Sequence, residues 1–128
     1  MSIKSSKTLL NEALSQIKTI EPSEAKILIE KDNCNLIDIR EINELEDTGR
    51  VENSCHFPRS TLEFLIDPNS QYFLNQEIDI NKEIVLFCAG GVRSALAAKT
   101  LQEMGFKNVS HIKGGFSLMM AEGFKIIK

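Results

Sequence analysis

The fold is decided by residues 84–105, IVLFCAGGVRSALAAKTLQEMG. Four continuous apolar residues lead into Cys88, which is typical of a central strand covered on both faces. Two glycines and an arginine follow, and then an alanine-rich helix runs to Gly105, a residue that favours a helix end. A buried strand that turns directly into a helix is typical of a parallel sheet.

Strand and helix patterns alternate along the rest of the chain, which predicts an α/β fold: a parallel sheet with helices on both faces. We expect residues 1–18 to form an N-terminal helical extension and residues 19–128 to form the domain. The predicted strands are 34–40, 51–57, 82–88 and 109–112, and the predicted helices are 6–18, 22–33, 41–49, 62–66, 93–105 and 116–123.

The composition narrows the partners. The chain has 128 residues, a net charge of −3 and no long basic run. Nucleic acid and anionic membranes demand a basic face, so neither is expected as the main partner. No segment is apolar enough to span a bilayer or serve as a secretory signal, so we expect a cytoplasmic location. The protein is expected to be a monomer or a homodimer. Three cysteines and no zinc-type spacing predict neither a disulfide framework nor a metal site.

Cys88 is the candidate nucleophile. Ligands of an open α/β sheet bind beyond the carboxyl ends of the strands, where this residue lies. Backbone N–H groups of the following loop, the helix N-terminus and the Arg93 charge all favour a thiolate, so its pKa should fall. Ser94 either bonds the loop or sulfur or caps the helix. The candidate loop consists of Ala89, Gly90, Gly91, Val92, Arg93 and Ser94.

Loop length separates two kinds of chemistry. Cysteine phosphatases use Cys-x5-Arg, a loop that surrounds a phosphoryl group, whereas Cys88 and Arg93 are spaced as Cys-x4-Arg. The shorter loop suits a persulfide sulfur better than a tetrahedral phosphate. The alternative is that Cys88 is only a small buried hydrophobic residue.

Four stretches resemble the rhodanese family of sulfurtransferases, in the family's order. NLIDIRE (35–41) looks like its Asp-x-Arg signature, and GRVENSCHFPRS (49–60) resembles its GHIPGAxxIPR segment. Residues 84–115 are similar to its active-site strand, loop, helix and Gly-Gly turn, and PSEAKILIEKDN (22–33) matches the helix before the first signature. The similarity covers residues 19–124.

The resemblance implies a five-stranded parallel sheet and a double displacement. The Cys88 thiolate would take a sulfur atom from an anionic donor, thiosulfate or a persulfide, and pass it to cyanide or a thiol. Backbone N–H groups of Ala89 to Arg93 would stabilise the persulfide, and Arg93 would hold the donor or orient the loop. No metal or organic cofactor is implied.

Two parts of the sequence depart from the family pattern. VENS (51–54) replaces IPGA, so that Glu52 and Asn53 stand where the family has Pro and Gly, and Asn53 could preserve the turn because Asn tolerates left-handed backbone. Met119 replaces the aromatic residue that usually follows the Gly-Gly turn. PRSTLEFLIDPNS (58–70) resembles one prokaryotic subgroup, which suggests a bacterial or archaeal source.

Other residues carry weaker hypotheses. Asp38 and Arg40 could line the active-site edge, but a structural ion pair is favoured. Arg59 could add positive charge at the pocket mouth or be a solvated surface residue. Glu63 could pair with Arg59 across one helical turn, but a solvated position is favoured. Cys55 could resolve a Cys88 persulfide as a disulfide, but a buried strand cysteine is favoured. His56 and His111 receive no metal or general-base role.

Two rival functions stay open. The fold could serve as a non-catalytic interaction module, against which the complete set of Cys88, glycines and Arg93 argues. It could also support a phosphatase or arsenate reductase, against which the short loop argues.

Overall fold

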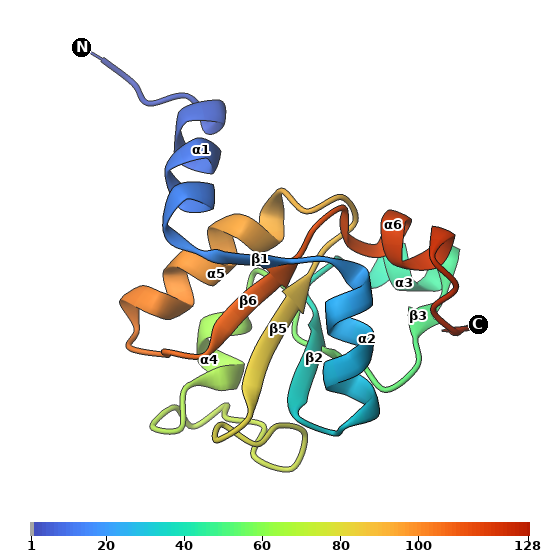
Figure 1. The fold of residues 1–128 in the computed structure, drawn as a ribbon. Helices are drawn as coiled ribbons and strands as arrows, with labels where there is room; N and C mark the ends of the chain where they lie inside the picture. Colours follow the sequence, from blue (N-terminus) through green and yellow to red (C-terminus); the bar gives the residue numbers. More distant parts are fainter. Residues whose placement is uncertain (1) are drawn as a thin grey trace.

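The strand that leads to Cys88 lies in the middle of a five-stranded sheet in the computed structural model, which describes residues 2–128 (Figure 1). The strand order is β1-β6-β5-β2-β4, and every neighbouring pair is parallel, which confirms the predicted fold class. The strands are β1 (Lys18–Ile20), β2 (Cys34–Asp38), β4 (Cys55–His56), β5 (Glu83–Phe87) and β6 (Val109–Ile112).

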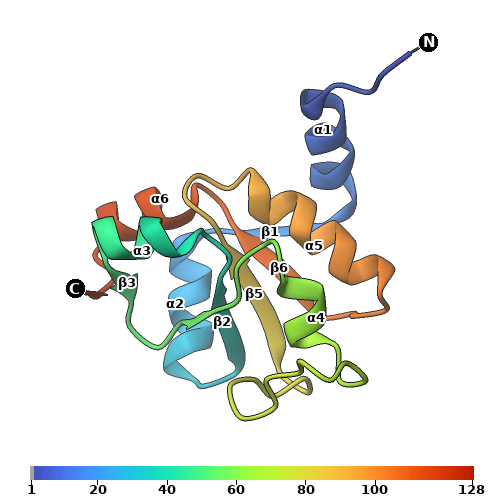
Figure 2. The same ribbon diagram turned by 180° about the vertical axis from the view of Figure 1, so that it is seen from behind.

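Helices cover both faces of this sheet, as Figures 1 and 2 show from opposite sides. Successive β5 residues contribute to two separate cores, because strand side chains alternate between faces. Val85 and Phe87 pack with α2 and α6, whereas Ile84 and Leu86 pack with α4 and α5. Burial on both faces explains the continuous apolar run. The helices are α1 (Ser6–Gln16), α2 (Pro22–Glu30), α3 (Ile42–Thr48), α4 (Leu62–Ile66), α5 (Arg93–Glu103) and α6 (Gly115–Ala121).

The strand predicted at 51–57 is wrong as a single element. It is split into β3 (Arg50–Val51), which pairs antiparallel with β7 (Ile126–Ile127), and β4, which joins the main sheet. The break is a turn at Asn53, whose φ of 71° is left-handed. Asn tolerates this conformation better than most residues, which preserves a turn despite the changed family motif.

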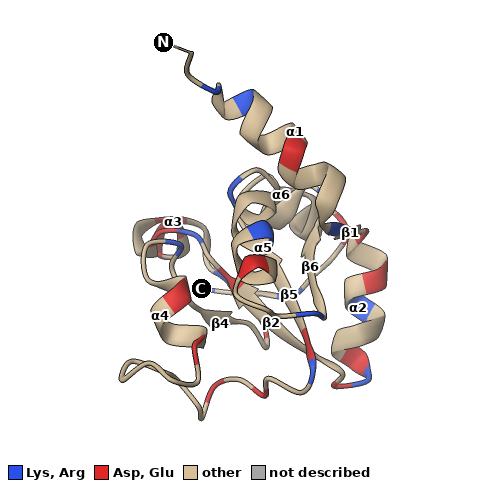
Figure 3. Cartoon of the chain, turned by 90° about the vertical axis from the view of Figure 1, so that its left-hand side faces the viewer, with Lys and Arg blue, Asp and Glu red and all other residues tan. Residues whose placement is uncertain are grey.

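The N-terminal helix α1 is confirmed. It packs against α5 and projects from the rest of the molecule (Figure 3), with Ala13 as its buried residue. The strand that follows it, β1, was not predicted, because three residues are too few to show a period. This strand pairs with β6 and brings Thr19 beside His111. Within residues 2–128, none of the helices combines the length and apolarity needed to cross a membrane.

Candidate active site

Cys88 lies immediately after β5, at the carboxyl edge of the sheet, and is 1% exposed. Its sulfur accepts hydrogen bonds from the backbone N–H of Gly91 at 3.1 Å and of Ser94 at 3.3 Å. The Ser94 hydroxyl oxygen lies 3.5 Å from the same sulfur. Burial raises the pKa of Cys88, but the bonds from Ser94, Gly91 and Gly90 together outweigh it and hold the pKa below its ordinary value. The loop therefore favours a thiolate, as predicted.

Glycines let the loop close around the sulfur. Gly91 has a φ of 95°, in the left-handed region that favours glycine, whereas a Cβ on Gly90 would meet no atom within 4 Å. The carbonyls of Cys88 and Ala89 accept hydrogen bonds from the first turn of α6: the Phe116 N–H at 2.8 Å and the Ser117 N–H at 3.1 Å. This approach requires Gly115, because a Cβ there would overlap the Cys88 carbonyl oxygen. The Gly-Gly turn thus anchors the backbone of Cys88.

Arg93 makes a two-pronged ion pair with Glu44 of α3, with both N–O distances at 2.8 Å. The same carboxylate accepts the Glu41 N–H at 2.7 Å at the start of α3. The Arg93 hydrogen bonds lower the pKa of Glu44 to about 2. In this structure the pair ties Arg93, at the start of α5, to α3, and an incoming anion would have to share the guanidinium with Glu44.

Glu44 was missed by sequence reasoning. Glu41 and Glu44 have the spacing of a helix capping box, which indicates where α3 begins. The pattern does not indicate which side chain contacts the Glu44 carboxylate. Its partner Arg93 is 49 residues away along the chain.

Asp38 and Arg40 form a buried ion pair at 2.8 Å, which confirms the favoured structural reading. The remaining Arg40 donors bind Thr48 Oγ1 at 2.8 Å and the Gly49 carbonyl at 3.0 Å. Its guanidinium also stacks 4.0 Å from the centre of the Phe116 ring. Because the Phe116 N–H holds the Cys88 carbonyl, this pair braces the floor of the loop rather than offering charge to a ligand.

Arg59 pairs with Glu63 at 2.9 Å, so the structure shows the less favoured of the two expectations for Glu63. The Arg59 guanidinium also lies 3.4 Å from Thr100 Oγ1, and the two contacts hold the start of α4 against α5. Its charge is thus already partnered.

His111 was also missed. Its Nδ1 lies 2.9 Å from Ser94 Oγ, and its Nε2 lies 2.9 Å from Thr19 Oγ1. Burial lowers the pKa of His111 to about 4, so the imidazole is neutral at neutral pH. The only available signal was a polar residue in an apolar strand. His56 lies elsewhere, with Nε2 2.7 Å from the Arg40 carbonyl oxygen.

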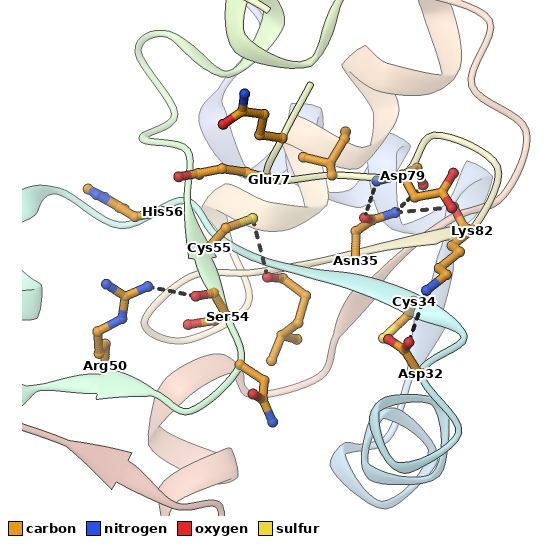
Figure 4. A pocket seen from close by; sticks show the side chains of 14 residues that line it. Asp32, Cys34, Asn35, Arg50, Ser54, Cys55, His56, Glu77, Asp79 and Lys82 are labelled. Atoms are coloured by element: carbon orange, nitrogen blue, oxygen red, sulfur yellow. Dashed lines mark hydrogen bonds and ion pairs between the residues drawn. The ribbon is translucent and has the colours of Figure 1, made fainter. Parts of the chain in front are cut away.

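A cavity of about 650 Å³ opens beside β2 and the edge strand β4, and Cys34 and Cys55 are among the residues that line it (Figure 4). Burial raises the pKa of Cys34 to about 11 and that of Cys55 to about 12. Several polar side chains of the cavity bind one another or the backbone: Asn35 bonds the 79–83 backbone, Lys82 pairs with Asp32, and Arg50 donates to the Ser54 carbonyl. The two thiols are therefore weak nucleophiles, and several of the polar groups around them already have hydrogen-bond or ion-pair partners.

Cys55 is too far from Cys88 to form a disulfide in this structure. It pairs with Ile37, which pairs with Leu86 of β5. Two strand spacings, about 10 Å, therefore separate Cys55 from β5, whereas bridged Cα atoms lie within about 7 Å. The favoured reading of Cys55 as a strand cysteine agrees with this geometry.

The rhodanese-like domain model matches residues 21–122 of this chain, including β2, the Cys88 loop and the Gly-Gly turn. The chain belongs to the rhodanese-like domain family. Similar curated proteins include a tRNA uridine(34) hydroxylase of Acinetobacter baumannii, 30% identical over 80% of the chain but only 32% of that protein. This rhodanese-like domain therefore spans about a third of the length of the curated relatives it matches.

Two solved structures resemble this rhodanese-like domain over most of both chains. One, from Rhodopseudomonas palustris, is of unknown function and described as a possible tyrosine phosphatase. It is 40% identical, with a TM-score of 0.89, and covers 99% of this chain and 98% of its own. The other is a homodimeric polysulfide-sulfur transferase of Wolinella succinogenes. It is 32% identical, with a TM-score of 0.75, and covers 94% of this chain and 85% of its own.

Proposed function

We propose that this rhodanese-like domain is a sulfurtransferase that carries sulfane sulfur on Cys88. The observation that carries the proposal is the cradle on Sγ, where the N–H groups of Gly91 and Ser94 meet a buried sulfur with a lowered pKa. Such a thiolate is a nucleophile, and the same donors can stabilise negative charge on a sulfur attached to it.

The reaction has two displacements. The Cys88 thiolate attacks the outer sulfur of thiosulfate, an S–S bond forms to Sγ, and the S–S bond of the donor breaks to release sulfite. Cyanide or a thiolate then attacks that outer sulfur and leaves as thiocyanate or a persulfide, which restores the Cys88 thiolate. The exposed rim of the loop, at Gly90 and Val92, leaves room for a small donor.

A free persulfide could replace thiosulfate as donor, since its outer sulfur is the same electrophile. Three free cysteines suit a reducing compartment, and we infer a cytoplasmic location for that reason. The chain covers a third of the tRNA uridine(34) hydroxylases and has a net charge of −3, so we do not extend a tRNA substrate to it.

Phosphatase activity is the second candidate, because the Rhodopseudomonas palustris protein is described as a possible tyrosine phosphatase. The Cys-x4-Arg spacing and the Arg93–Glu44 pair both disfavour it, because phosphate binding would need a wider loop and a free guanidinium. Hydrolysis of a generic aryl phosphate that depends on Cys88 would reverse this ranking.

Intact-protein mass after thiosulfate treatment tests the proposal directly. The wild type should gain one sulfur atom, which cyanide removes, and Cys88→Ser should gain none. The double variant Cys34→Ser/Cys55→Ser is the matched control and should behave as wild type. If neither thiosulfate nor glutathione persulfide adds sulfur to Cys88, the sulfurtransferase assignment is wrong.

A further inference from the structure

A network of polar side chains connects the Cys88 sulfur, at the end of the central strand β5, to the edge strand β1. Ser94 Oγ lies 3.5 Å from Sγ and 2.9 Å from His111 Nδ1, and His111 Nε2 lies 2.9 Å from Thr19 Oγ1. The four residues come from the end of β5, from α5, from β6 and from β1. Ser94 and His111 are buried, whereas Thr19 is exposed. The network therefore extends from the Cys88 sulfur to the protein surface at Thr19.

Both ring nitrogens of His111 are engaged, which limits how protons can be arranged. The buried imidazole is neutral, and a neutral imidazole has one N–H donor and one acceptor nitrogen. The hydroxyls at its two ends each supply one proton and can also accept. Whichever nitrogen carries the proton, the hydroxyl on the other side must donate.

The state of Cys88 selects between the two arrangements. A thiol can donate its S–H to Ser94 Oγ, so that the Ser94 proton points to Nδ1 and Nε2–H donates to Thr19. A thiolate can only accept, so the Ser94 proton must point to the sulfur. Ser94 Oγ is then free to accept from Nδ1–H, and the Thr19 hydroxyl donates to Nε2.

The nearby charged groups are engaged elsewhere. On β1 and β5, Lys18 and Glu83 pair at 3.7 Å, and Glu83 also accepts from Ser110. Lys113, beyond the end of β6, pairs with Glu21. Arg93 on α5 is bound by Glu44. Burial, rather than a charge, is what keeps His111 neutral.

We propose that His111 is a positioning residue that, as the Nδ1–H tautomer, donates to Ser94 and thereby holds the Ser94 hydroxyl proton on the Cys88 thiolate. The Thr19 hydroxyl completes the network by donating to Nε2. Between the thiol and thiolate arrangements the network loses one proton to a solvent base, and no bond between heavy atoms changes. The inference rests on the nucleophilic role of Cys88 proposed above.

Nitrogen NMR of protein labelled with ¹⁵N-histidine tests the tautomer. The chain has two histidines, so His56→Gln assigns the signals. Thiolate formation is followed in the same sample by ultraviolet absorbance, which reports Cys88 because the pKa values of Cys34 and Cys55 are raised to about 11 and 12. Under conditions where Cys88 is ionised, His111 should be the Nδ1–H tautomer. An Nε2–H tautomer under those conditions overturns the proposal.

A double-variant cycle tests whether His111 acts through Ser94. The readout is the rate of Cys88 alkylation by iodoacetamide against pH, with circular dichroism to select folded variants. His111→Leu should slow alkylation about threefold at a pH below the thiol pKa, because a smaller fraction of Cys88 is then thiolate. In a Ser94→Ala background, the same change should have no further effect. His111→Asn, whose amide N–H can replace Nδ1–H, should restore the rate.

Two results contradict the proposal in this cycle. His111→Leu could leave alkylation unchanged when Ser94 is present, or it could slow alkylation equally when Ser94 is absent, which would indicate a general packing effect. Neither the NMR nor the alkylation assay involves sulfur transfer. A failed persulfide experiment therefore leaves this test intact, and a failed test leaves the persulfide result intact.

Discussion

Two sites on one sheet affect the pKa of a partly or fully buried thiol in opposite ways. In the cavity beside β2 and β4, burial raises the pKa of Cys34 and Cys55 to about 11 and 12. At the carboxyl edge, Cys88 is more deeply buried, yet hydrogen bonds from its loop bring its pKa below the ordinary value. Burial alone therefore does not decide reactivity, and the N–H donors aimed at the sulfur do.

The largest expected effect on stability contrasts Asp38, at the carboxyl end of β2, with Asp32, just before the amino end of the same strand. Removing Asp38 leaves Arg40 buried without its partner, so Asp38→Ala should cost about 3–5 kcal/mol of unfolding free energy. Asp32→Asn removes the charge from an exposed pair with Lys82, keeps a residue type that tolerates the left-handed φ of 53° at this position, and should cost about 1 kcal/mol at most. Urea denaturation of both variants measures the difference. Equal losses would show that the carboxyl edge does not depend on its buried pair.

The next effect is a pH dependence of stability that comes from the buried His111 on β6. Its pKa of about 4 in the folded state is below the ordinary 6.5, so the unfolded chain binds more protons between these values. Its contribution is complete above pH 6.5 and is lost as the pH falls toward 4, a change of about 3 kcal/mol. Denaturation of the wild type and His111→Gln across this range should show their difference shrinking with acid. A constant difference contradicts the buried neutral state.

A smaller effect separates the adjacent loop glycines. Alanine at Gly91 would carry its φ of 95° into an unfavourable region and place a Cβ 3.2 Å from the Gly114 nitrogen. Losing the aligned N–H should cost the thiolate about 2 kcal/mol, equivalent to about a 30-fold lower alkylation rate below the thiol pKa. Gly90→Ala, which meets no atom within 4 Å, should stay within about threefold of the wild type. Similar losses in both variants would mean that the loop donors do not set the reactivity.

The smallest effect is expected in the cavity beside β2 and β4. Cys34→Ala and Cys55→Ala should leave Cys88 alkylation and persulfide formation within about twofold, because their protonated thiols lie away from the loop. Each should lower stability by about 1 kcal/mol, since a partly buried sulfur is removed. Peptide mapping after alkylation should find label on Cys88 first. Label on Cys34 or Cys55 before Cys88 would reverse the comparison of the two sites.

Much of the candidate site could be predicted from the chain alone. The apolar run before Cys88, the glycines after it and the helix that follows are local patterns, and local patterns report backbone geometry directly. The predicted strand at 51–57 failed because a turn at Asn53 interrupts an otherwise strand-like run. The strand β1 escaped prediction because three residues cannot display a period, although its pairing with β6 places Thr19 in the network of Cys88.

Local patterns in the sequence were sufficient to predict the parallel α/β class, the loop around Cys88 and the direction of its pKa shift. Long-range packing was needed to show which distant side chains support that loop. Glu44 meets Arg93 across 49 residues, and Thr19 meets His111 across 92. Such contacts depend on strand order and helix placement, which arise when the whole core packs together, whereas turns and strand ends depend on a few consecutive residues.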